Sequence, residues 1–265
     1  MQKKIWIKRS FSIPFVILLW MSIVMLQAAR RSNIFDPEGE NLVEQAQIEA
    51  QQSRLQLNLL KSAPTLGFRN LIADWTFLQF LQYFGNREHR DVTGYGLSGD
   101  FFEVIIDRDP YAYDPYIFLS SSLTLYAAQP ERAVELQAKG LQSLTPELPP
   151  ESYFIWRNKG IDEMLFLGDF EAAQRSHEIA AEWAAQSPDS RAEEDQVSLQ
   201  RTADFLATDP ENPQVRVNAW RQVLASAPDE QARAVAIENI EALGYEVTPR
   251  AGGGFTIQPK NSVAE

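Results

Sequence analysis

The chain has no cysteine among its 265 residues and only two histidines. The absence of cysteine excludes disulfide frameworks, thiolate zinc sites, iron–sulfur clusters and cysteine nucleophiles. With two histidines and no HExxH motif, a catalytic zinc would need carboxylate ligands, and no spacing in the chain marks such a set. The sequence therefore predicts no metal site and no cofactor.

The first 31 residues contain no acidic side chain, although the whole chain has 36 aspartates and glutamates. Four basic residues among the first nine precede an uncharged run over residues 11–29, and Arg30 and Arg31 follow it. At a rise of 1.5 Å per residue, a helix of this length reaches about 28 Å, which matches the hydrocarbon core of a bilayer. We therefore predict that residues 1–31 form an N-terminal membrane anchor, with a transmembrane helix at residues 11–29.

A cleavable signal peptide is the alternative, because its basic start and apolar core look the same. Cleavage after Ala29 would place Gln27 at the −3 position, and cleavage after Ala28 would place Leu26 there, so neither site has the small residue that cleavage favours. The larger positive charge before the span predicts a cytoplasmic N-terminus. The body of this single-pass membrane protein is then expected in the bacterial periplasm, or in a thylakoid lumen in a photosynthetic source.

The residues after the leader are strongly acidic. They include 18 of the 24 basic residues and all 36 acidic ones. Such a body repels nucleic acid, whose binding depends on neutralising phosphates, so no nucleic-acid partner is expected. It also repels anionic lipid headgroups, and the simplest role of its charge is to keep the surface solvated.

Apolar periodicity and Pro or Gly punctuation divide the body into helices. A long helix is predicted over residues 38–62, as a stalk or linker, and a polar loop is expected over residues 86–96. Alternating residues around three consecutive glycines predict a small β-hairpin at residues 245–248 and 255–258. The fold class is therefore predicted to be all-α with a C-terminal β-hairpin. The remaining predicted helices cover residues 66–84, 98–107, 112–128, 130–144, 151–167, 169–186, 190–207, 213–227 and 229–243.

Two of these helices form the clearest pair. Each has mostly apolar or small residues at spacings of three or four, which marks one face of an α-helix. Gly168 and Asp169 between them allow only a tight antiparallel turn, so the two faces are expected to bury each other. Small residues in the faces would let the backbones approach closely. The faces consist of Tyr153, Trp156, Gly160, Met164 and Leu167 on the first helix, and of Phe170, Ala173, His177, Ala180 and Ala184 on the second.

At these residues the chain resembles the tetratricopeptide repeat family, whose unit is a pair of helices with small residues at fixed contacts. The similarity includes one extra residue between Gly160 and Gly168. Weaker units fall at residues 66–110 and 112–146, where the alanine of the second helix, Ala133, precedes Ala173 by forty residues. The resemblance implies an α-solenoid of TPR-like helical hairpins, with packing positions at Trp156, Gly160, Gly168, Phe170, Ala173 and Ala180.

The resemblance also implies protein–protein recognition, because the first helices of stacked pairs line a groove for an extended peptide or a partner helix. By position, the groove residues are Phe154, Arg157, Asn158 and Ile161. Arg69 and Asn70 occupy the analogous helix of the first unit, where they would either help to clamp a partner's C-terminal carboxylate or form an ordinary solvated face. The expected function is a non-catalytic, membrane-tethered scaffold or assembly factor for a membrane complex.

These assignments divide the chain into successive parts. The predicted parts are a membrane anchor at residues 1–31, a helical stalk or linker at 32–64, TPR-like repeats at 65–187, C-terminal helices at 188–244, and a β-hairpin with a tail at 245–265.

An acidic–tyrosine cluster supports an alternative function. Carboxylates beside aromatic rings occur in glycosidases, so the alternative is a carbohydrate-active envelope hydrolase. The same residues also occur where a turn between helices is capped and its tyrosines are half-buried, which is the interpretation we favour. A literal GxGxxG motif at residues 94–99 follows polar residues instead of a buried strand, so it predicts a loop and not a nucleotide site. The cluster comprises Asp107, Asp109 and Asp114 with Tyr111, Tyr113 and Tyr116.

Replacing Asp109 and Asp114 together with alanine separates the two interpretations of the cluster. If the carboxylates cap a turn, the variant loses about 0.5–2 kcal/mol of stability per cap and part of its helical circular dichroism. A catalytic pair would instead give a variant with unchanged helicity and no hydrolytic activity.

Overall fold

The computed structural model describes residues 18, 20–22, 24–25, 41–65, 67–208, 213–227, 229–250 and 254–260. The chain divides into two compact units, Met1–Gln45 and Ala46–Glu265. Most of the predicted anchor at residues 11–29 lies outside the described residues. Within the described part of the chain, no helix combines the length and the apolar character that a bilayer crossing requires.

The described body is mostly helical and ends in a two-stranded antiparallel hairpin, as the sequence predicted. Two of the helices, α6 and α8, each continue into a π-helical turn, labelled η1 and η2. The elements are α2 (Leu42–Ser62), α3 (Arg69–Gly85), α4 (Arg87–Thr93), α5 (Ser98–Arg108), α6 (Asp114–Ser121), η1 (Ser122–Tyr126), α7 (Pro130–Leu141), α8 (Ser152–Asp162), η2 (Glu163–Leu167), α9 (Phe170–Ala184), α10 (Ala192–Thr208), α11 (Pro213–Ser226), α12 (Glu230–Ala242), β1 (Tyr245–Pro249) and β2 (Phe255–Pro259).

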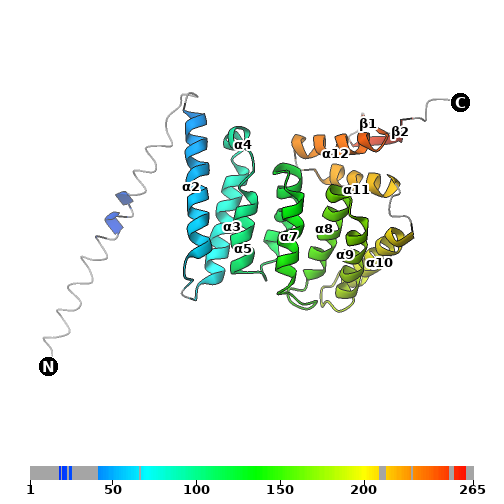
Figure 1. Ribbon diagram of the computed structural model, residues 1–265, viewed down its shortest axis with the longest axis horizontal. Coiled ribbons are helices and arrows are strands. Elements are labelled where there is room, and N and C mark those ends of the chain that lie inside the picture. Colours follow the sequence, from blue (N-terminus) through cyan, green and yellow to red (C-terminus); the bar gives the residue numbers. More distant parts are fainter. Residues whose placement is uncertain are drawn as a thin grey trace. The chain divides into compact units, whose positions relative to one another are not determined.

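The helices of the second unit pack mainly against their neighbours in the chain. Contacts join α3 to α5, α5 to α7, α7 to α8, α8 to α9, and α9 to α10. Figure 1 shows these helices side by side, while α11 and α12 run across the upper ends of the helices near α8. This crossing is made by packing of α11 on η2 and of α12 on η1. The C-terminal helices therefore cover the ends of α6 and α8.

The prediction of a loop at residues 86–96 is wrong, because most of this segment folds as the short helix α4. Asn86 caps this helix by accepting a hydrogen bond from the backbone N–H of His89. Arg90 is buried, with its guanidinium 3.8 Å from the centre of the Tyr83 ring. Gly94, at φ +67°, then ends α4. The GxGxxG motif thus follows a helix, and no strand precedes it.

The predicted close approach of α8 and α9 is confirmed. Gly160, Ala173 and Ala180 are all buried between the two helices. His177 packs against Gly160, and its Nδ1 donates a hydrogen bond of 2.8 Å to the carbonyl oxygen of Ala173. His177 is therefore a hydrogen-bonded core residue, and burial lowers the pKa of its imidazole. Gly168 forms the turn in the left-handed conformation.

One residue of the two faces that were predicted to be buried, Leu167, is exposed instead. Met164 is buried as expected, and so is the adjacent Leu165, but Leu167 is 36% exposed. The reason is the π-helical turn η2, which holds one residue more than an α-helical turn and shifts the phase of the positions within it. This turn lies between Gly160 and Gly168, the segment in which the TPR resemblance has one extra residue.

An ionic cluster joins α2, α5 and α7. Lys61 lies 3.2 Å from Asp100 and 2.8 Å from Glu103, and Arg132 lies 2.8 and 3.1 Å from the same two carboxylates. Partial burial opposes ionisation, but the two cations hold the pKa of Asp100 and Glu103 below the ordinary values. Because Leu57 of α2 is also buried in the core, α2 from Ala46 onward packs as part of the body.

The C-terminal hairpin packs on the last helix. β1 pairs antiparallel with β2, with Val247 opposite Ile257. Both side chains join the core cluster that contains Trp220 and Ile240. This packing supplies the apolar surface that an isolated two-stranded hairpin lacks in water.

Replacing Gly160 with alanine should destabilise the protein by about 1–3 kcal/mol, the usual cost of overpacking. A Cβ there would lie 2.6 Å from His177 Cε1 and 3.2 Å from the Ala173 carbonyl oxygen. Urea denaturation measures the change. Gly85→Ala is the control, because a Cβ at that position meets no atom within 4 Å. Equal stability of the two variants would contradict the close approach of α8 and α9.

Candidate functional site

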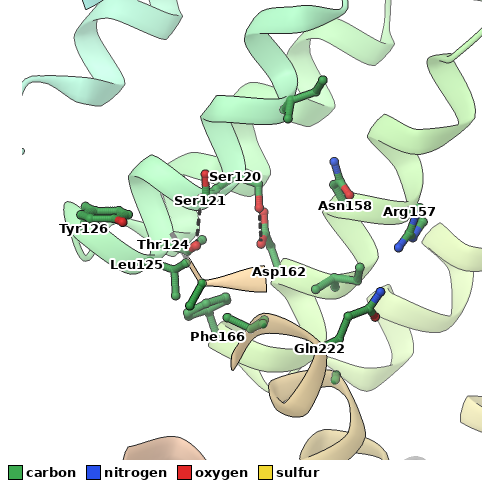
Figure 2. A pocket seen from close by; sticks show the side chains of 15 residues that line it. Ser120, Ser121, Thr124, Leu125, Tyr126, Arg157, Asn158, Asp162, Phe166 and Gln222 are labelled. Carbon is green, nitrogen blue, oxygen red and sulfur yellow. Dashed lines mark hydrogen bonds between the residues drawn. The ribbon is translucent and has the colours of Figure 1, made fainter. Parts of the chain in front are cut away.

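A cavity of about 450 Å³ lies where α6–η1, α8–η2 and α11 meet. Its wall combines apolar side chains with hydroxyl, amide, guanidinium and carboxyl groups (Figure 2). This composition is typical of binding pockets, in which a few polar groups orient a mainly apolar contact. The lining residues are Ile117, Ser120, Ser121, Thr124, Leu125, Tyr126, Arg157, Asn158, Ile161, Asp162, Phe166, Ala219, Gln222, Val223 and Ala227.

The helical period explains why these side chains converge. Arg157 and Asn158 each lie one turn before Ile161 on α8, at spacings of four and three, so all three share a face. Gly160 lies on a neighbouring side of α8, about 100° around the helix from Ile161, and α9 packs on that side. On α11, Ala219, Gln222 and Val223 have the same spacing and form the opposite wall. The cavity therefore depends on α11 crossing the end of α8.

Asp162 is the most unusual group of the site. Its side chain is completely buried and accepts hydrogen bonds from Ser120 Oγ at 2.8 Å and from Gln137 Nε2 at 3.0 Å. Figure 2 shows the bond to Ser120 at the cavity wall. No cation forms an ion pair with Asp162 among the described residues. Burial therefore raises the pKa of Asp162 to about 7, and the neighbouring Glu163 adds a smaller effect in the same direction.

The surroundings of Gln137 fit a protonated Asp162. Gln137 is buried, and its Oε1 has no hydrogen-bond partner among the described residues. Rotating the amide by half a turn would place Oε1 where it accepts a proton from Asp162 Oδ2, and oxygen and nitrogen of an amide are assigned by such networks. In that orientation the neutral acid donates to Oε1, and Nε2 takes the position that has no partner among the described residues.

Arg157 gives the cavity wall its positive charge. Its guanidinium lies 5.8 Å from the centre of the Phe154 ring, and within the described chain no carboxylate lies within ion-pair distance of it. The other cation of α8, Lys159, is engaged elsewhere, in an ion pair with Glu163 and a hydrogen bond of 3.1 Å to Ser176. The cavity therefore offers one unpaired guanidinium beside neutral donors and acceptors.

Three of the predicted groove residues line this cavity, and three do not. Arg157, Asn158 and Ile161 do so. The prediction that Phe154 is a groove residue is wrong. Its side chain is buried, stacked on Tyr153 at 4.2 Å between ring centres and covered by the guanidinium of Arg191. The cause is the chain entering α10, where Arg191 and Ala192 pack over the start of α8, so Phe154 does not line the cavity.

The first Arg–Asn pair does not join the cavity. Arg69 and Asn70 begin α3, and neither lines the cavity. Arg69 Nη2 donates a hydrogen bond of 2.7 Å to the carbonyl oxygen of Asp107, at the end of α5. This contact gives Arg69 a role in capping α5.

The predicted packing residues have the following positions. Gly160, Ala173 and Ala180 are buried. Trp156 is half-buried, with its ring 5.9 Å from that of Trp183, and Phe170 is half-buried against the cluster around Trp220. Gly168 is exposed in the turn.

The acidic–tyrosine cluster is engaged in local structure. Asp109 accepts a hydrogen bond from the backbone N–H of Tyr111 at 3.1 Å, and Tyr116 is buried and donates to the carbonyl oxygen of Pro110 at 3.0 Å. Asp107 forms an ion pair with Lys139. Tyr113 packs against Phe154, and Asp114 begins α6. Asp109 thus stabilises the turn that follows α5, whereas no side chain caps the start of α6.

It was not predicted from the sequence that Ser120, Thr124 and Asp162 line a site, or that α11 forms one of its walls. Asp162 had one usable signal, since an acidic residue directly followed Ile161 in a mainly apolar helix. The contribution of α11 had none, because it depends on packing between residues about sixty positions apart.

Three comparisons with known proteins gave no match: no protein-family model, no curated protein and no solved structure is similar to this chain. Among the described residues, no group of three His, Asp or Glu side chains is arranged to hold a metal ion.

Replacing Asp162 with asparagine should remove a pH dependence of stability. A pKa raised in the folded state stabilises the protein fully below the unfolded value of 3.8, and this contribution is lost as the pH rises through about 7. Each unit of pKa shift corresponds to about 1.4 kcal/mol, so the free energy of unfolding of the wild type falls by up to about 4 kcal/mol over this interval. The variant, which has no carboxyl group at this position, does not show this loss. Urea denaturation at pH 4 to 8 measures this, so the variant should gain stability over the wild type as the pH rises.

Glu135→Gln, which removes an exposed carboxylate of α7, is the matched control. Parallel stability curves of Asp162→Asn and the wild type over this pH range would show that Asp162 is ionised throughout.

Proposed function

We propose that this protein is a membrane-tethered, non-catalytic scaffold or assembly factor that holds a segment of a partner protein in the cavity beside α8. The observation that carries the proposal is the cavity itself, with Arg157, Asn158 and Ile161 on one wall. These residues come from the helix that the TPR resemblance assigns to a peptide groove.

The arrangement of α6–η1 with α7, and of α8–η2 with α9, supports a TPR-like solenoid. The two π-helical turns begin at Ser122 and Glu163, 41 residues apart, and each directly precedes the turn to the next helix. In the second helices, Ala133 and Ala173 are forty residues apart, and both are completely buried. Two successive helix pairs thus repeat the same irregularity, which is what duplicated units would give.

The size and chemistry of the cavity favour a short polypeptide segment. A volume of about 450 Å³ holds one or two large side chains but no folded domain. Ile117, Leu125 and Phe166 offer apolar contacts to an anchoring side chain. Ser120, Thr124 and Asn158 offer hydrogen bonds to the backbone beside it, and Arg157 attracts an acidic residue or a chain terminus.

The predicted anchor at residues 11–29 adds a concentration effect. A tether confines the body to the volume beside the bilayer, so a weak interaction with a membrane-bound partner becomes effectively intramolecular. This is the benefit that a single-pass anchor would give to an assembly factor.

Site-specific photocrosslinking in native membranes tests the proposal. A benzoylphenylalanine placed at Asn158, at the cavity wall, should capture a defined partner, whereas the same group at Arg175, which is exposed on α9, should not. Ile161→Arg should abolish the capture and weaken binding of the purified partner at least tenfold, about 1.4 kcal/mol, because a cation then fills the apolar part of the cavity.

Circular dichroism of the Ile161→Arg variant confirms that it is folded. The proposal is wrong if Asn158 and Arg175 capture the same proteins, or if Ile161→Arg binds the purified partner as tightly as the wild type does.

A further inference from the structure

Helix α3 presents an apolar face to solvent. Phe68, at its N-cap, is followed by Leu71, Trp75 and Leu78 at spacings of 3, 4 and 3, which places the four side chains in one row. They are 63%, 63%, 55% and 52% exposed. Exposed apolar residues are ordinary when scattered singly, but a row of four large ones marks an interaction surface.

Packing within the body does not explain this row. The opposite face of α3, with Ala73, Phe80 and Tyr83, is already buried in the core. A helix that is apolar on all sides is normally covered on all sides, by protein or by lipid. In contrast, the outward positions of α9, such as Glu171 and Arg175, are charged.

The neighbouring helix also exposes apolar side chains. Gln56 of α2 and Gln79 of α3 are hydrogen-bonded at 3.0 Å, so the two helices are adjacent there. Leu55 and Leu59 of α2 are 59% and 69% exposed. Both lie on the side of α2 opposite the buried Leu57.

Charge distinguishes this region from the rest of the acidic body. Residues 50–85 contain three basic side chains and a single acidic one, Asp74. Lys61 pairs with Asp100 and Glu103, and Arg69 is bound to a backbone carbonyl, so the exposed charges left in this region are Arg54 and, beside the apolar face, Asp74. The remainder of the body, with its excess of carboxylates, is repelled by anionic headgroups. Electrostatics therefore favour this region over any other as the side that approaches a lipid surface.

We infer that the apolar face of α3, formed by Phe68, Leu71, Trp75 and Leu78, inserts into the interface of a lipid bilayer. Trp, Phe and Leu together are the residues that interfacial helices bury at the boundary of headgroups and acyl chains. The outward side of a helix is a ridge, which lipid accommodates without a matching hollow. A body tethered by a membrane anchor already lies beside such an interface.

Spin labels on the full-length protein in phosphatidylcholine nanodiscs test this inference. Because the chain has no cysteine, Leu71→Cys and Leu78→Cys each give a single labelling site. Both positions are exposed, so the substitutions should leave the fold intact. We expect the labels to collide readily with oxygen and several-fold less with a water-soluble nickel complex. Arg175→Cys on α9 is the control, and its label should show the reverse.

Labels at Leu71 and Leu78 that behave like the control would overturn the inference. It is also overturned if these labels are shielded from both reagents, in nanodiscs and in detergent micelles alike, because a protein surface then covers the face. Neither result bears on the cavity, where capture at Asn158 reports independently.

Discussion

The close approach of α8 and α9 is the contact from which the geometry of the candidate site follows. Gly160 lets the ring of His177 lie against the backbone of α8, and the hydrogen bond from His177 to Ala173 fixes that ring within α9. With one side of α8 committed in this way, the helical period directs Arg157, Asn158 and Ile161 to another side. The position of the cavity wall is thus constrained by packing on a neighbouring side of the same helix.

The π-helical turns connect this packing to the C-terminal helices. In η1 and η2 the additional residue widens the helix end just before it turns, which changes the side chains presented there. α12 packs against η1 and α11 against η2, so both C-terminal helices rest on irregular turns. Since α11 forms the opposite wall of the cavity, the π-helical turn η2 supports one wall of the site.

The polar groups of the cavity are supported by uncharged neighbours. Ser120 and Gln137 donate to Asp162, and no cation compensates its charge within the described residues. Such a site favours the neutral acid, whose burial costs far less than that of a carboxylate. The cation of the wall, Arg157, lies on the preceding turn of the same helix. Ser120 and Asp162 are thus engaged with each other, whereas Arg157 has no ion-pair partner among the described residues.

Much of the fold followed from local patterns in the sequence. The helices from α5 to α12 and the hairpin were predicted because caps, prolines and apolar periods act within a few residues. The contact of Gly160 with α9 was predictable for the same reason, since a two-residue turn leaves adjacent helices little choice. The helix α4 was missed because its sequence is polar and its stability comes from the buried Arg90.

The candidate site was predictable only in part. Arg157, Asn158 and Ile161 followed from the helical period and a family resemblance, and the apolar residues of α3 were visible as such. That Phe154 is covered by the chain entering α10, that α11 closes the cavity, and that one face of α3 stays exposed were all decided by tertiary structure. The sequence alone determined which residues share a helix face. Which faces meet depends on contacts between distant segments, whose free energies no local pattern contains.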